Sequence, residues 1–260
     1  GRVEILPETY PESWMFVDDA SFSSMYGGKM MLMDLAETRP THRLKATADK
    51  SLLGNFTQAK KRRELYIMES FHERGARGPR TDVLSIYSKT SMAIIKELVW
   101  KDTTRLQALP ERYSMTLSSD EKFLFVANFS PAASFTVVDL DTKEIVETID
   151  TPGCVLTYPT GSNSVSSLCS NGGMLTTVVD KDGHKKSQHR LAPFFSTDDT
   201  PIYERPAIID GIAYFPSFLG KVHAVDLRGE TAKYIDSWSL LTKEEQSKGW
   251  RPGGLALIDI

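Results

Sequence analysis

The most regular feature of the sequence is a set of short apolar segments that returns five times along the chain. Each copy has an apolar strand, a turn, a second apolar strand that ends near Asp or Ser, a short polar turn and a further strand. The turn-starting residues are Asp34, Ser88, Asp139, Asp180 and Asp226, which lie 54, 51, 41 and 46 residues apart. Propeller blades repeat about every 40 to 50 residues. The pattern therefore predicts an all-β protein, a β-propeller of four-stranded antiparallel blades.

The strand after Lys122 shows the alternation that a packed blade needs. One face would carry Phe123, Phe125, Ala127 and Phe129, and the other Leu124, Val126 and Asn128. Because both faces are largely apolar, we expect the blade to be covered on both sides by other blades.

The residue that starts each polar turn has a local explanation. A short Asp or Ser side chain accepts a hydrogen bond from the backbone two residues on and so begins a tight turn between the third and fourth strands. The alternative, a ring of metal-binding carboxylates, is disfavoured because one carboxylate per blade would be spread around the ring.

The end of the chain departs from the repeat. A helix is predicted over about Thr242 to Lys248, where Thr242 and Glu245 have the spacing of a capping box and Gly249 stops the helix. A strand is predicted over Leu255 to Ile260, as the start of a sixth blade. We therefore expect residues 1–260 to form a single β-propeller domain that is incomplete, with five blades and one further strand.

Composition removes several classes of function. The chain has 260 residues, is 40% hydrophobic and 25% charged, and has a formal net charge of −3. This balance excludes disorder and disfavours nucleic acid as a partner, and no apolar run approaches the roughly 20 residues of a membrane span.

Motifs of catalysis or metal binding are also missing from the sequence. It contains no nucleophile elbow, P-loop, zinc-protease or dinucleotide motif. Its five histidines are dispersed, and we interpret His184 and His189, five residues apart, as solvated rather than as metal ligands. The run Lys60–Arg63 is read as a solvated turn, with a docking patch for an acidic partner as the alternative. We predict neither a catalytic centre nor a metal site on this chain.

The two cysteines, Cys154 and Cys169, are too far apart in sequence for a CxxC redox pair and lack further zinc ligands. Their spacing leaves a disulfide or two buried thiols. If they lie on neighbouring antiparallel strands a bridge is feasible, and it would persist only in an oxidising compartment such as the periplasm.

Several segments resemble the heavy chain of the quinoprotein amine dehydrogenases, the methylamine and aromatic amine dehydrogenase family. The resemblance is strongest at Phe71–Asp82, and it continues at Phe129–Ala132, at the Cys154 and Cys169 pair before Asn171–Gly173, and at Leu241–Gly254. It covers nearly the whole chain from about residue 14.

The resemblance implies a fold and an assembly. The fold is a seven-bladed propeller, and the assembly is a periplasmic heterotetramer of two heavy and two light chains. In that family the light chain carries tryptophan tryptophylquinone, which oxidises a primary amine to an aldehyde and ammonia and passes electrons to a blue copper protein or a c-type cytochrome. No cofactor is expected on this chain, and Cys154 and Cys169 would form the family's heavy-chain disulfide.

The resemblance also implies a substrate channel lined by a blade-two loop. The family projects a Phe into the channel, and an ungapped count from Arg77 and Gly78 puts that position at Leu52. Leu53 and Phe56 could replace it after a small gap, so the predicted channel residues are Leu52, Leu53 and Phe56.

Two other functions remain open at the level of sequence. One is a propeller that serves only as an interaction scaffold for another periplasmic redox partner, without amine dehydrogenase activity. The other is a self-sufficient propeller enzyme, such as a lactonase, which would need carboxylates and Asn that converge on a central metal.

Overall fold

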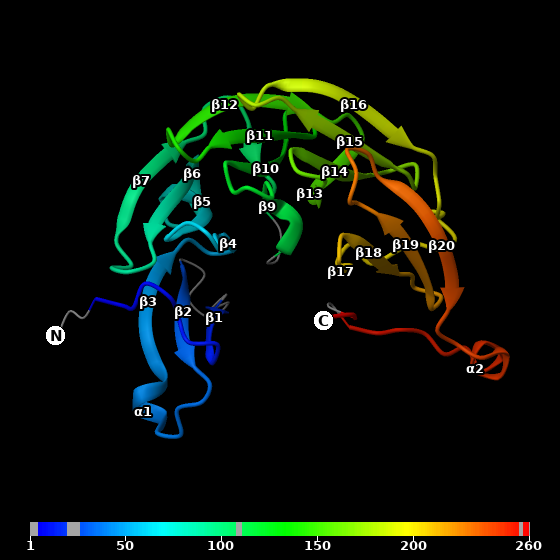
Figure 1. The fold of residues 1–260 in the computed structure, drawn as a ribbon, viewed down its shortest axis with the longest axis horizontal. Coiled ribbons are helices and arrows are strands. Elements are labelled where there is room, and N and C mark those ends of the chain that lie inside the picture. Colours follow the sequence, from blue (N-terminus) through cyan, green and yellow to red (C-terminus); the bar gives the residue numbers. More distant parts are fainter. Residues whose placement is uncertain (1–4, 20–26, 108–110, 255–256, 260) are drawn as a thin grey trace. The chain divides into compact units, whose positions relative to one another are not determined.

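The structure is a computed structural model that describes residues 5–19, 27–107, 111–254 and 257–259. Contacts divide the chain into two compact units, unit 1 (Gly1–Arg112) and unit 2 (Tyr113–Ile260). In both units almost all regular structure is antiparallel β-sheet, which confirms the all-β prediction (Figure 1). The single-domain boundary of 1–260 stays a prediction.

Unit 1 contains a three-stranded sheet and a four-stranded sheet, each paired in chain order. The first sheet comprises β1 (Trp14–Asp19), β2 (Gly28–Asp34) and β3 (Leu44–Lys50), with the short helix α1 (Pro40–Arg43) before β3. The second comprises β4 (Asn55–Gln58), β5 (Glu64–Arg74), β6 (Arg77–Ser88) and β7 (Ile94–Val99), and the two-residue strand β8 (Thr104–Arg105) follows. Of the first part of the chain the structure describes β1 as far as Asp19, and residues 20–26 lie outside the described part.

Unit 2 contains three further sheets, whose strands again pair in chain order. The 3-10 turn η1 (Arg112–Ser114) precedes them. The first sheet is built from β9 (Met115–Leu117), β10 (Phe123–Ser130), β11 (Ser134–Asp139) and β12 (Glu144–Asp150). The second is built from β13 (Cys154–Thr160), β14 (Ser164–Cys169), β15 (Met174–Val179) and β16 (Lys185–Leu191), and the third from β17 (Ala207–Ile209), β18 (Ile212–Pro216), β19 (Lys221–Asp226) and β20 (Lys233–Ser239).

Each unit has its core between neighbouring sheets. In unit 1, Met30 and Ala48 of the first sheet pack against Leu65, Ile67 and Tyr87 of the second. In unit 2, four residues of the β9–β12 sheet, Phe123, Phe125, Phe135 and Val137, pack with Val165 and Val179 of the next sheet. Burial of each large apolar side chain is worth about 1.5–3 kcal/mol. The prediction that blades are apolar on both faces is confirmed for β10, whose residues Phe123–Ala127 are all buried.

The predicted turns between third and fourth strands form after β6, β11, β15 and β19, whereas Asp34 ends β2, the second strand of its described sheet, and α1 follows before β3. Asp139 accepts from the backbone N–H groups of Asp141 at 2.8 Å and Thr142 at 3.0 Å. The other four residues make the same kind of bond to the backbone two residues on: Asp34 to Ala36, Ser88 to Thr90, Asp180 to Asp182 and Asp226 to Arg228. Hydrogen bonds from the Arg228 side chain and backbone lower the pKa of Asp226 to about 2. Local turn formation therefore accounts for the repeated residue.

The predicted helix is present as α2 (Lys243–Ser247), with Thr242 and Glu245 in a capping box and Gly249 at a φ of 76°. The predicted strand at Leu255–Ile260 is not formed in its described part, Leu257–Asp259, and its other residues lie outside the described part. Within the described residues, no helix is long and apolar enough to cross a membrane.

Candidate functional site

The loop between β3 and β4 contains the residues that the resemblance assigns to a substrate channel. Leu52 and Leu53 are half-buried in this loop, and Leu53 has a φ of 56°. A non-glycine residue in this left-handed region costs about 1–3 kcal/mol, and such residues are frequent at functional sites. Phe56 lies in β4, where its ring centroid is 5.1 Å from that of Phe16 and it packs against the core of unit 1. The channel assignment itself stays a prediction.

Arg105 connects this loop to β4 and β5 through hydrogen bonds of its guanidinium. It is 1% exposed, and its Nε donates to Ser70 Oγ at 2.8 Å. Its Nη1 donates to Asn55 Oδ1 at 2.7 Å, and its Nη2 donates to the carbonyl oxygen of Leu53 at 3.1 Å. Burial lowers the pKa of Arg105 to about 10, so the guanidinium remains charged at neutral pH. A single buried cation therefore fixes both ends of the segment Leu53–Asn55.

Asp82 is the anion that faces this cation. It is 3% exposed, and its Oδ1 accepts from Ser70 Oγ at 2.6 Å while its Oδ2 accepts from the backbone N–H of Arg105 at 2.9 Å. Arg80 makes a bidentate contact to the same carboxylate, at 2.7 and 2.9 Å, and donates to the carbonyl of Arg105 at 3.2 Å. Asp82 thus connects β6 to the residues that hold the loop.

Glu69 holds the beginning of the loop. Its Oε1 accepts from the backbone N–H of Ser51 at 2.7 Å, and its Oε2 accepts from the hydroxyl of Ser85. Ser51 Oγ in turn accepts from the backbone N–H of Ser70 at 3.0 Å. Burial raises the pKa of Glu69, against the lowering effect of these hydrogen bonds. The loop is therefore bonded to a polar network at Ser51, Leu53 and Asn55.

Sequence reasoning found only part of this network. Arg80 and Asp82 belong to the segment that carries the resemblance, but no role was assigned to them. Arg105 was missed because it lies in a short irregular stretch with no hydrophobic period or motif around it. Its burial depends on the fold, and no local sequence signal predicts it.

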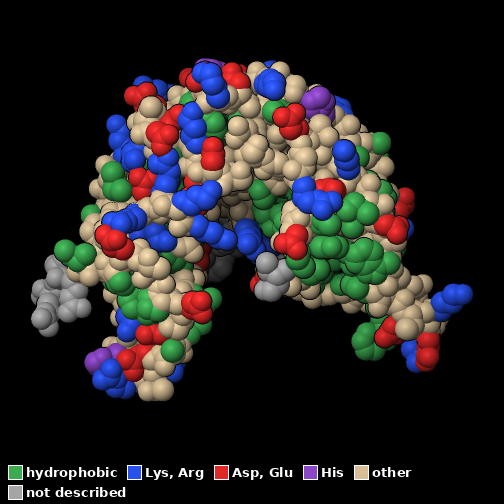
Figure 2. All heavy atoms as spheres, viewed as in Figure 1, with side chains coloured by type: hydrophobic (Ala, Val, Ile, Leu, Met, Phe, Trp, Pro, Cys, Tyr) green, Lys and Arg blue, Asp and Glu red, His purple; other side chains and the backbone are tan. Residues whose placement is uncertain are grey.

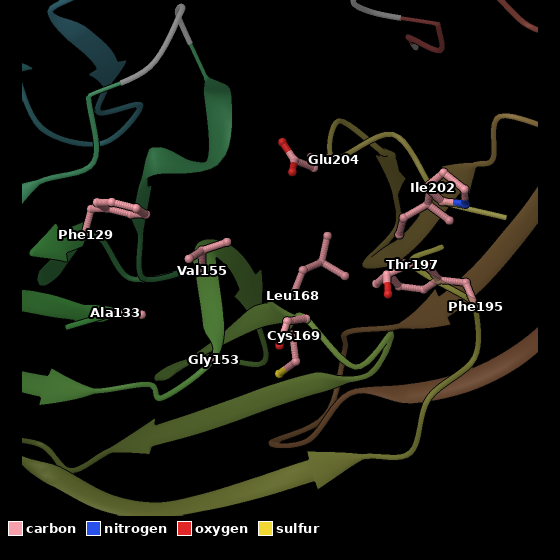
Figure 3. A pocket seen from close by; sticks show the side chains of 12 residues that line it. Phe129, Ala133, Gly153, Val155, Leu168, Cys169, Phe195, Thr197, Ile202 and Glu204 are labelled. Carbon is pink, nitrogen blue, oxygen red and sulfur yellow. The ribbon is translucent and has the colours of Figure 1, made fainter. Parts of the chain in front are cut away.

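Unit 2 contains a separate apolar cavity of about 450 Å³ at the ends of its sheets. Figure 3 shows Phe129 and Ile202 on opposite sides of this cavity, with Val155 and Leu168 between them and the carboxylate of Glu204 at its margin. Phe129 was expected to continue the buried face of its strand, but the pairing of β10 with β11 ends at Asn128 and Phe129 is 64% exposed.

Exposed apolar residues extend from the rim of this cavity. The rings of Tyr203 and Phe218 stack with centroids 4.4 Å apart, and Phe218 and Leu219 are 48% and 40% exposed. Figure 2 shows hydrophobic side chains gathered over β17–β19 on the visible face of unit 2. This surface is suited to contact another apolar surface.

A disulfide joins Cys154 to Cys169, which face each other across β13 and β14. Of the two alternatives that the spacing left open, the structure therefore has the bridge rather than two thiols. Cys169 also lines the cavity, so the bridge fixes two strand ends at its wall.

The histidines are dispersed in the structure as in the sequence. His184 contacts Glu147 at 3.2 Å on the surface, whereas His189 contacts Ser187. His223 is 3% exposed, and burial lowers its pKa. In the part of the chain that the structure describes, no group of three His, Cys, Asp or Glu residues has the arrangement of a metal site.

Comparison with solved structures supports the propeller-like arrangement of the sheets. The chain superposes on a functionally unknown protein from Desulfotomaculum acetoxidans DSM 771 with a TM-score of 0.55 and 9% identity, over 81% of this chain and 62% of that one. It superposes on dihydro-heme d1 dehydrogenase NirN in complex with DHE with a TM-score of 0.51 and 13% identity, over 91% of this chain and 55% of that one. At these identities the likeness shows the fold alone, that of a partial propeller.

Sequence comparison gives the family. The chain is 27% identical to the methylamine dehydrogenase heavy chain of Methylorubrum extorquens (strain AM1) over 82% of its length and 52% of that protein. It is 31% identical to the heavy chain of Paracoccus versutus over 70% of its length and 42% of that protein, so it spans about half the length of the curated relatives it matches. Residues 35–259 match the family Methylamine dehydrogenase heavy chain (MADH). The chain therefore belongs to the methylamine dehydrogenase heavy chain family.

Proposed function

We propose that this chain is part of the non-catalytic heavy subunit of a periplasmic amine dehydrogenase. Its family membership over residues 35–259 is the observation that carries this proposal. The partner light chain would hold tryptophan tryptophylquinone and oxidise a primary amine to an aldehyde and ammonia. Two heavy and two light chains would form the complex, which would pass electrons to a blue copper protein or a c-type cytochrome.

The role of this chain in the complex would be to support the light chain and to line the substrate channel. The bonding of the loop Ser51–Asn55 supports this role, because a wall that orients a substrate must itself be held in place. Leu52 and Leu53 are the wall residues of the proposal, and Phe56 supports the loop from the core side. The exposed aromatic side chains of unit 2 agree with a subunit that buries part of its surface in an assembly.

Periplasmic location is supported by the disulfide between Cys154 and Cys169. Such bonds persist in oxidising compartments, and a bacterial periplasm is one of them.

The proposal is tested by purification of the full-length protein after coexpression with its light chain. We expect a small, disulfide-rich chain to copurify, a quinone absorption in the visible range, and amine-dependent reduction of an artificial electron acceptor with release of aldehyde and ammonia. A chain that purifies with another redox protein and without quinone absorption would support the scaffold function instead. A chain that binds neither would contradict both.

A further inference from the structure

The hairpin of β5 and β6 projects beyond its sheet as a two-stranded ribbon. β4 covers β5 only as far as Met68, and β7 covers β6 only from Val83. Residues 71–81, which we call the ribbon, therefore pair only with each other in the ladder, from Phe71 opposite Thr81 to Arg74 opposite Arg77. A two-stranded ribbon has little stability of its own, so a role outside the sheet is the better explanation for its length.

The base of the ribbon is anchored to the buried network described above. Arg80, near its end, makes the bidentate contact to Asp82 and the bond to the Arg105 carbonyl. The side chain of Arg80 is 26% exposed and that of Asp82 is 2% exposed. The ribbon is thus attached to the core of unit 1 through a charged contact that is mostly removed from water.

The tip is shaped by two glycines. Gly75, at a φ of 70°, begins the two-residue turn Gly75–Ala76. Gly78 has a φ of 93°, and a Cβ at this position would lie 3.3 Å from Cζ of Arg74. The carbonyl of Gly78 is also 3.2 Å from Nδ1 of His72. The guanidinium of Arg74 therefore packs on the backbone of Gly78, which limits its orientations.

The tip concentrates positive charge that the protein does not neutralise. Arg74 and Arg77 are both exposed and lie directly opposite each other in the ladder. Like charges in this arrangement destabilise a sheet. Within the residues that the structure describes, neither guanidinium has an ion-pair partner. An external anionic group between the two side chains would remove this repulsion and would accept several charge-assisted hydrogen bonds.

The chemistry of the ribbon favours a protein as the source of that anion. Both guanidiniums are exposed on a projecting tip, so a small free anion would not be enclosed. The net charge of the chain is −3, which disfavours a polyanion such as nucleic acid. Phe71 at the ribbon is 44% exposed and adds an apolar contact of the kind that protein interfaces bury.

We propose that the ribbon, through Arg74 and Arg77, is a docking arm for a carboxylate-bearing surface of the light chain. The inference rests on the proposed function, because it takes the light chain as the partner. A carboxylate of that surface would bind between the two guanidiniums, and the anchored base would keep the arm in position for docking.

The test uses the coexpressed full-length complex and the dissociation constant of the light chain at low and high salt. We expect Arg74→Gln with Arg77→Gln to weaken binding on the order of 10- to 100-fold at low salt, and to reduce its salt dependence. Arg74→Lys with Arg77→Lys keeps the positive charge and should weaken light-chain binding less than the Gln variant does. The matched control is Lys185→Gln with Lys186→Gln, which removes the same charge from exposed positions on β16 and should change binding by less than about 3-fold.

A photo-crosslinking amino acid at Ala76 identifies what the tip contacts. A crosslink to an acidic segment of the light chain is the expected result. A crosslink to the electron acceptor or to a second heavy chain, or a Gln variant that binds the light chain as wild type does, would overturn the docking proposal and leave the proposed function intact. If wild-type protein holds no quinone-bearing light chain, both proposals fail together.

Discussion

Replacement of Arg105 by Met gives the most direct test of how the loop Ser51–Asn55 is held. The change removes the hydrogen bonds to Ser70, Asn55 and Leu53 while it keeps an apolar side chain in the buried space. Hydrogen bonds to a charged group contribute about 1.5–3 kcal/mol each, so the three bonds are worth about 5–9 kcal/mol before the cost of burying the ion.

The cost of burial reduces this sum. Burial lowers the pKa of Arg105 to about 10, which corresponds to a penalty of about 3 kcal/mol on the charged form. Asp82 keeps Arg80 as its ion-pair partner when Arg105 is gone. We therefore expect Arg105→Met to lower the free energy of unfolding by about 2–6 kcal/mol.

Urea denaturation of the full-length protein measures this loss, and hydrogen exchange locates it. The amide of Gly54, which donates to the carbonyl of Ser51 at 3.0 Å, should exchange faster in Arg105→Met. The urea midpoint of Arg105→Lys should lie between those of wild type and Arg105→Met, because one ammonium cannot reach all three acceptors. The control is Arg39→Met, whose side chain is 65% exposed, and it should leave the midpoint unchanged. Wild-type stability and wild-type exchange at Gly54 in Arg105→Met would refute the role of Arg105.

Three further outcomes are expected. Burial raises the pKa of Glu69 above its ordinary 4.5, so this group stabilises the fold more as the pH falls through its folded pKa. The stability of Glu69→Gln relative to wild type should therefore be highest at alkaline pH and should decline on acidification. A pH-independent difference between the two urea midpoints would contradict this. Cys154→Ala with Cys169→Ala should lower the free energy of unfolding by about 2–5 kcal/mol without loss of activity per folded molecule. Free thiols titrated in the denatured, unreduced wild-type protein would argue against the bridge. Leu52→Phe and Leu53→Phe should each shift the ratio of kcat/KM between a small alkylamine and an arylalkylamine by the equivalent of about 1–3 kcal/mol, and an unchanged ratio in steady-state kinetics would remove the loop from the channel.

The strands that sequence analysis found are those with long apolar patterns. β10 is buried along most of its length, and its apolar run Phe123–Ala127 made it visible in the sequence. β4, β9 and β17 have only three or four residues each and were not identified, because so short a segment shows no period. Their place in the sheets follows from pairing with a longer strand, which is a tertiary effect.

In the candidate site, too, contacts between residues close in sequence were predictable and contacts between distant residues were not. The turn residues and the capping box were predictable because each hydrogen bond joins residues two or three positions apart. The network around Arg105 joins this residue to Leu53, which is 52 positions away. Only the fold brings these groups together, and therefore only the structure could reveal how the loop is held.

Leu53 has a backbone conformation that is uncommon for a leucine. Its φ of 56° is a conformation that glycine adopts without steric cost, yet the glycine of this loop is the next residue, Gly54. The backbone alone therefore gives no reason for a leucine at this position. The bonds from Arg105 to the Leu53 carbonyl and to Asn55 offset the conformational cost and keep the leucine side chain in place. A wall of the proposed channel would need a side chain in a fixed position, and Leu53→Phe tests whether Leu53 has this role.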